Sequence, residues 1–175
     1  MMYRERKFRD SLSKKQFEDS RDKTAMCIPL IEKQIGGILI HNEIFNSRSF
    51  EVTLDVDYGI DLVWIRGRSM VPVGVRTSNS DTPYFSISCD NDSGQPAEYD
   101  EIKNNYLTPV YIFKITFENG QPKRLYIAKS DELIEYIDVH KPRKYRSDKD
   151  KHWYYSIRMS HYAKYYTIKQ YELKG

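Results

Sequence analysis

The chain has 175 residues, of which 39% are hydrophobic and 30% are charged, and this balance is typical of one soluble domain. The sequence has no apolar run of membrane-spanning length and no signal-peptide core near its N-terminus. Its two cysteines, Cys27 and Cys89, lack the spacing of a metal site. We therefore expect a cytoplasmic protein with free thiols and no membrane partner.

The formal net charge of +3 is unevenly distributed along the chain. Residues 141–175 carry ten Lys and Arg against three acids, residues 1–23 carry eight against five, and residues 24–140 carry ten against seventeen. An acidic centre can hold a divalent metal, and basic flanks can bind a phosphate backbone. The same distribution is also compatible with ends that are simply solvated.

Residues 1–37 are helical in character. Ser13 is expected to cap a helix that begins near Lys14. Pro29 predicts either one kinked helix or two separate helices. The glycine pair at 36–37 is expected to end this helical part.

Residues 38–140 are expected to form the core of a sheet. Apolar runs and alternating patterns predict strands at 38–40, 50–56, 60–65, 71–77, 85–89, 108–117 and 125–128. The Asn119-Gly120 pair predicts a type I′ turn between the last two of these strands. Ser130 is expected to cap a following helix.

Residues 141–175 form a basic, Tyr-rich part with a charged loop at 141–151, an alternating strand at 153–159 and a last strand within 165–173. The sequence contains no internal repeat and no sign of a second domain. We therefore predict a single α/β (α+β) domain over residues 1–175, in which helices pack against a sheet.

An acid and a cation stand on neighbouring predicted strands. Asp61 follows a glycine where one strand opens, and Arg76 lies near the end of the next strand. Metal-dependent hydrolysis of phosphodiesters uses carboxylate ligands beside a cation that holds the phosphate. Asp61 is therefore the first candidate metal ligand, Asp57 and a helical acid such as Glu18 can complete the site, and Arg76 would face the phosphate.

This arrangement resembles the PD-(D/E)xK, or restriction-endonuclease-like, superfamily. That family carries a strand-borne Asp, often in a Gly-Ile/Tyr-Asp motif, and then a strand that reads hydrophobic-Glu/Gln-hydrophobic-Lys. Gly59-Ile60-Asp61 matches the first motif, and the segment 73–76, Val-Gly-Val-Arg, occupies the second. The resemblance implies a restriction-endonuclease-like fold, with a mixed central sheet flanked by helices, and a metal-dependent nuclease with Mg²⁺ (or Mn²⁺). Its implied catalytic residues are Asp61, Arg76 and Glu18, and its implied metal ligands are Asp61, Asp57 and Glu18.

The sequence departs from the family pattern at two positions. Gly74 replaces the Glu or Gln, and Arg76 replaces the Lys with a cation that cannot give up its proton. Either the site has rearranged, or the fold persists without catalysis in a protein that binds nucleic acid or a protein partner. Asp61 can also cap backbone amides, and it can form a purely structural bridge with Arg76. The segment 98–103 holds an acid and a Lys in the family's order, and it can instead start a helix that orients Arg76 or Arg124.

Cations and aromatic residues are interleaved in the C-terminal part. Aromatic rings stack on unpaired bases while Lys and Arg follow phosphates, so this pattern favours binding to single strands of DNA or RNA. The residues expected at this interface are Arg76, Lys141, Arg143, Lys144, Arg146, Trp153, Tyr154 and Arg158. The same rings are also compatible with core positions, a protein interface or a homodimer. The small size and the tyrosine content further suggest an accessory protein of a phage or mobile element.

Overall fold

The computed structural model of the chain describes residues 11–41, 60–90, 97–106, 108–148 and 152–173. The helices in these ranges are α1 (Ser11–Ile35), α3 (Glu98–Lys103), α4 (Ser130–His140) and α5 (Met159–Tyr162). The strands are β1 (Ile38–His41), β2 (Leu62–Arg66), β3 (Ser69–Ser78), β4 (Tyr84–Asp90), β5 (Tyr111–Glu118), β6 (Gln121–Lys129), β7 (Lys144–Arg146), β8 (Trp153–Arg158) and β9 (Lys169–Glu172). Together they confirm the predicted α/β class.

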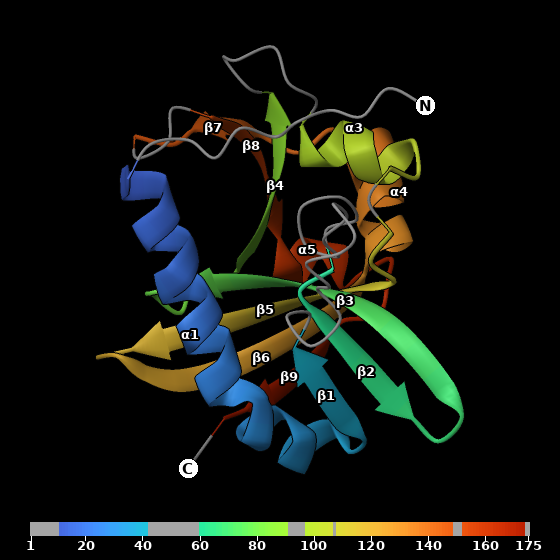
Figure 1. Ribbon diagram of the computed structural model, residues 1–175. Coiled ribbons are helices and arrows are strands. Elements are labelled where there is room, and N and C mark those ends of the chain that lie inside the picture. The colour runs from blue at the N-terminus through green and yellow to red at the C-terminus, as the bar shows by residue number, and fades with distance from the viewer. Residues whose placement is uncertain (1–10, 42–59, 91–96, 107, 149–151, 174–175) are drawn as a thin grey trace.

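Six strands form a central mixed sheet in the order β1-β2-β3-β5-β6-β9 (Figure 1). β1, β2 and β3 are an antiparallel meander, β5 is parallel to β3, and β6 and β9 are antiparallel to their neighbours. A parallel pair needs a long connection, and here that connection contains β4 and α3. The register of the parallel pair places Arg76 opposite Lys114.

Helix α1 covers one face of the central sheet (Figure 1). Its buried residues Cys27 and Ile31 belong to the same hydrophobic cluster as Phe113 and Phe117 of β5. The helix is continuous through Pro29, which lies on its exposed side. The structure therefore has one continuous helix here, and the alternative of two separate helices is wrong. Ser13 lies inside this helix, so its predicted role as the cap is wrong.

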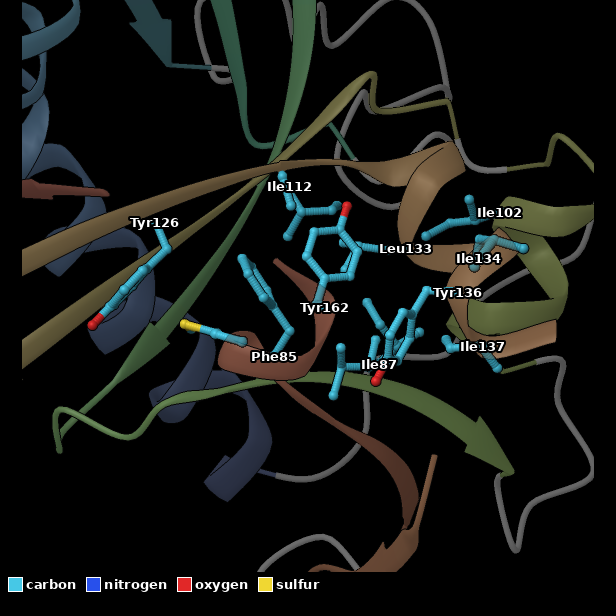
Figure 2. Close-up of a cluster of buried hydrophobic side chains, with 13 residues drawn as sticks. Phe85, Ile87, Ile102, Ile112, Tyr126, Leu133, Ile134, Tyr136, Ile137 and Tyr162 are labelled. Carbon is cyan, nitrogen blue, oxygen red and sulfur yellow. The ribbon is translucent and has the colours of Figure 1, made fainter. Parts of the chain in front are cut away.

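The other face of the central sheet packs against α4, α5 and a second, three-stranded sheet in the order β4-β8-β7, here called the small sheet. Figure 2 shows this cluster, in which Phe85 and Ile87 of β4 lie near Leu133 of α4 and Tyr162 of α5. β7 falls inside the segment 141–151 that was expected to be a loop. The prediction of one sheet was therefore incomplete.

Two further local predictions are resolved by the structure. Asn119 and Gly120 both have positive φ, 51° and 76°, as the predicted turn between β5 and β6 requires. Ser130 is the first residue of α4 and is not its cap, because Lys129 holds the N-cap position. The Ser130 hydroxyl instead donates a hydrogen bond to the carbonyl oxygen of Pro109. The predicted strand at 50–56 lies outside the described residues.

Candidate functional site

Asp61 and Arg76 lie side by side where β2 begins. The backbone N–H of Asp61 donates to the carbonyl oxygen of Val73 at 2.9 Å, which sets Asp61 beside β3. Its Oδ2 accepts a hydrogen bond from the backbone N–H of Val75 at 2.5 Å and lies 3.9 Å from Nη1 of Arg76. The expected meeting of the strand acid with the cation of the next strand therefore takes place. The same carboxylate oxygen is also engaged by the strand backbone.

Glu98, the first residue of α3, brings a second carboxylate to Arg76. Its Oε1 forms an ion pair with Nη2 of Arg76. The Glu98 side chain is only 12% exposed, against 37% for Arg76. The backbone N–H of Glu98 donates to Oγ of Ser88 at 3.0 Å, which fixes the start of α3 on β4. We call Asp61, Arg76 and Glu98 the Arg76 bridge.

The neighbouring cation on β5, Lys114, has a different environment. It is buried, and its Nζ donates to the carbonyl oxygen of Thr82 at 2.7 Å, to the Thr82 hydroxyl at 3.0 Å and to the carbonyl oxygen of Tyr84. Burial lowers the pKa of Lys114 to about 8, although the nearby Asp81 carboxylate opposes this shift. Lys114 therefore holds the loop before β4 against the central sheet.

Asp81 gathers a second polar cluster on the same side of the sheet. It pairs with Nη1 of Arg124 and accepts hydrogen bonds from the hydroxyls of Thr116 at 3.1 Å and Tyr126 at 3.3 Å. Arg124 also donates from Nε to Glu172 at 2.6 Å. The sequence left open whether the segment 98–103 orients Arg76 or Arg124. In the structure Glu98 pairs with Arg76, while Arg124 pairs with Asp81 and Glu172.

The implied metal site can be compared with these carboxylates. Asp57 lies outside the described residues, and so does the side chain of Glu18. Within the described ranges, no group of three or more His, Cys, Asp or Glu side chains is arranged to hold a metal ion. Asp61 and Glu98 do converge, but they converge on a guanidinium, which would repel a divalent cation placed beside it. The two carboxylates as arranged compensate the charge of Arg76. Binding of Mg²⁺ at this position stays a prediction.

The basic and aromatic C-terminal residues divide between the two faces of the small sheet. The β7–β8 register pairs Lys144 with Tyr155, Tyr145 with Tyr154 and Arg146 with Trp153, and neighbours along a strand point to opposite faces. The inner face, toward the hydrophobic cluster, carries Lys144, Arg146, Trp153, Tyr155 and Ile157. The outer face carries Tyr84, Ser86, Tyr145, Tyr154, Ser156 and Arg158. The predicted interface residues therefore do not form one surface.

The outer face presents a pair of stacked rings. Tyr145 and Tyr154 have ring centroids 5.6 Å apart and an interplanar angle of 22°. The Tyr145 hydroxyl donates to Oγ of Ser86 at 3.0 Å, which anchors the ring on β4. Tyr145 is 39% exposed. The pair is therefore ordered by contacts within the sheet while one of its rings remains accessible.

The predicted cations reach this region from different elements. Arg158 ends β8 on the outer face, and Arg143 lies just before β7, where its carbonyl oxygen accepts from the N–H of Ser156 at 2.9 Å. Lys141 is exposed beyond the end of α4 in a left-handed conformation, φ 47°. Arg76 belongs to the central sheet and is engaged in the Arg76 bridge. The interface predicted from the sequence is thus divided among the outer face, the inner face of the small sheet, the end of α4 and the Arg76 bridge.

Comparisons with protein-family models, with curated proteins and with solved structures find no match for this chain. The resemblance to the PD-(D/E)xK superfamily therefore stays a prediction from the residues. Among the helices described, none combines the length and the apolar character needed to cross a bilayer. Both cysteines are free thiols, with Cys27 buried and Cys89 partly buried.

Proposed function

We propose that this protein binds single-stranded nucleic acid through the outer face of the small sheet and does not hydrolyse it. The observation that carries the proposal is the stacked pair of Tyr145 and Tyr154 beside Arg143 and Arg158. Within the described part of the chain, neither arginine has a carboxylate partner. Stacked rings next to uncompensated cations suit a ligand with exposed bases and a phosphate backbone.

Several other cations of the described ranges are already paired with carboxylates. Ion pairs with carboxylates engage Arg76, Lys103, Lys123, Arg124 and Lys129. A cation that is already paired gains less from a phosphate, because the existing carboxylate must be displaced. Compared with these paired cations, Arg143 and Arg158 are better placed to meet a polyanion, and the stacked tyrosines distinguish their surface from other exposed charges.

The Arg76 bridge supports the second half of the proposal, the lack of hydrolysis. Arg76 stands where the family has a Lys, and its guanidinium keeps its proton at any ordinary pH. Gly74 stands where the family has a Glu or Gln, and among the described residues the carboxylates of Asp61 and Glu98 both pair with Arg76. In this proposal the bridge is a structural joint between β2, β3 and α3.

A metal-dependent nuclease is the second candidate, and one observation favours it. Asp61 and Glu98 approach the same point from different elements, so Glu98 can take the place of the acid missing at Gly74. In such a site the guanidinium would have to move aside before Mg²⁺ could bind both carboxylates. This candidate predicts cleavage that depends on the metal and on Asp61.

The test measures binding of labelled single- and double-stranded DNA and RNA in EDTA. We expect single strands to bind most tightly, and binding to weaken as salt rises because phosphate contacts release counterions. Tyr154→Ala should weaken binding by about 5- to 100-fold, the range expected for loss of one stacked base. Tyr106→Ala removes a ring that is 67% exposed outside the small sheet and should leave binding unchanged.

Two results would overturn the proposal. Absence of binding to every nucleic acid would remove the function altogether. Cleavage that requires Mg²⁺ or Mn²⁺ and is lost in Asp61→Ala would establish the nuclease instead. Circular dichroism of each variant separates a loss of function from a loss of fold.

A further inference from the structure

An open pocket of about 390 Å³ lies where β8 runs into α5 and meets the segment that follows α4. The side chains that give it its chemical character are Arg143, Arg158, Lys164, Ser156, Ser160 and His161. Three of them are cations, two are hydroxyl donors, and the pocket lining contains no carboxylate. The pocket is therefore suited to an anion.

The three cations of the pocket are available for a ligand. In the described ranges Arg143, Arg158 and Lys164 form no ion pair with any acid, and each is exposed. They come from three places in the chain: the segment before β7, the end of β8 and the turn after α5. Bringing three like charges together is unfavourable in the absence of a counter-charge, and a bound anion removes that repulsion.

His161 is held in position at the wall of the pocket. Its Nδ1 shares a hydrogen bond of 2.6 Å with the Tyr136 hydroxyl, and its ring contacts the Tyr165 ring at a centroid distance of 5.3 Å. Tyr165 is 55% exposed, and its ring also contacts that of His140 at 4.2 Å. An accessible aromatic ring therefore stands next to a residue of the anion pocket, where the base of a nucleotide whose phosphate occupies the pocket could stack.

The pocket is continuous with the proposed nucleic-acid surface. Tyr154, Ser156 and Arg158 alternate along β8, so they project from the same outer face. The first of them belongs to the stacked tyrosine pair, and the other two line the pocket. A strand whose bases stack near Tyr154 can thus reach the pocket with one of its phosphates.

We propose that this pocket binds the terminal phosphomonoester of a single-stranded nucleic acid, an inference that rests on the proposed function. A phosphomonoester carries a charge of about −1.5 to −2 at pH 7 and has three terminal oxygens. An internal phosphodiester carries only one negative charge and two such oxygens. Three cations and two hydroxyls match the terminal group better, because Arg side chains can bind two of its oxygens at once.

The test compares three labelled single strands of one sequence in EDTA: with a 5′-phosphate, with a 3′-phosphate, and with hydroxyls at both ends. We expect one phosphorylated strand to bind at least about tenfold more tightly than the hydroxyl strand, the effect of one or more charge-assisted hydrogen bonds. The end that gives the preference identifies the polarity of the bound strand. Lys164→Ala and Ser160→Ala should each lower this ratio, while Lys33→Ala, which removes an exposed charge on α1, should retain it.

The outcomes separate the inference from the proposed function. Equal affinity for all three strands overturns the terminal-phosphate pocket and leaves the binding function standing. A preference that survives in both Lys164→Ala and Ser160→Ala places the phosphate elsewhere and also overturns the pocket. No binding by any strand overturns the inference together with the function on which it rests.

Discussion

Arg76 of β3 and Glu98 of α3 form an ion pair that joins the central sheet to the helix placed beside the small sheet. Through its other terminal nitrogen, Arg76 also lies 3.9 Å from Asp61. The long connection between β3 and β5 contains β4 and α3. The ion pair therefore holds this connection against the central sheet. The acid-and-cation pattern from which the sequence predicts a catalytic centre thus connects two layers of the fold, and in the proposed function this structural connection is its role.

The Arg76 bridge should contribute measurably to stability. Glu98→Gln removes the charge of a 12% exposed carboxylate and leaves Arg76 only partly compensated, so we expect the free energy of unfolding to fall by about 1–3 kcal/mol. Urea denaturation measures this change. Lys129→Met breaks an ion pair with Glu132 that solvent screens, so it should cost clearly less than Glu98→Gln. Equal losses in the two variants would contradict the assignment of the bridge as a structural joint.

Lys114 should make stability depend on alkaline pH. Its pKa is about 8 in the folded protein and 10.5 in the reference state, so the unfolded chain binds more protons between these values. The Lys114 contribution to the free energy of unfolding therefore rises with pH, by on the order of 1.5 kcal/mol between about pH 8 and 9.5. Lys114→Met should lack this rise. Parallel stability curves for the two proteins over this range would contradict the lowered pKa.

The two cysteines should differ in reactivity. Burial raises the pKa of the Cys27 thiol to about 11, and Cys27 has no exposed surface, whereas Cys89 is partly exposed. We expect a thiol reagent to modify Cys89 in the native protein and Cys27 only after unfolding. Cys89→Ser should therefore abolish the fast reaction. Rapid modification of the native Cys89→Ser variant would show that α1 opens readily from the sheet.

Salt titration should count the phosphate contacts of the outer face. Each contact to a single strand adds about 0.7 to the slope of log K against log salt concentration. Arg143→Gln and Arg158→Gln should each reduce the slope by roughly this amount, because both arginines are proposed to meet phosphates. Lys33→Gln, on α1, should leave the slope unchanged. An unaltered slope in both arginine variants would place the nucleic acid on another surface.

The parts of this fold that depend on neighbouring residues could be predicted from the sequence. The turn at Asn119 and Gly120 follows from the conformational preference of that pair, and Asp61 and Arg76 meet because their strands are consecutive and antiparallel. Ser130 has the residue type of a cap, but the Pro109 carbonyl, from the segment that precedes β5, takes its hydroxyl instead. Local preference does not reveal an acceptor that the tertiary fold supplies.

The rest of the site depends on contacts between distant segments. Ser88 of β4 pairs with Tyr154 of β8, and alternation in either segment predicts a strand without naming its partner. The small sheet, its outer face and the pocket at its end were therefore not predicted. Glu98 reaches Arg76 because its own N–H is fixed by Ser88. The sequence shows an acid at residue 98 at the start of a predicted helix, but it does not show that this acid lies beside Arg76.

The most direct measurement follows a labelled single strand, first bound in EDTA and then incubated with Mg²⁺ and Mn²⁺. The proposed function predicts a strand that binds wild-type protein, binds Tyr154→Ala more weakly, and remains intact after addition of either metal. A strand that is cut by the wild-type protein in metal but not by Asp61→Ala would contradict it. That result would identify the Arg76 bridge as a catalytic centre.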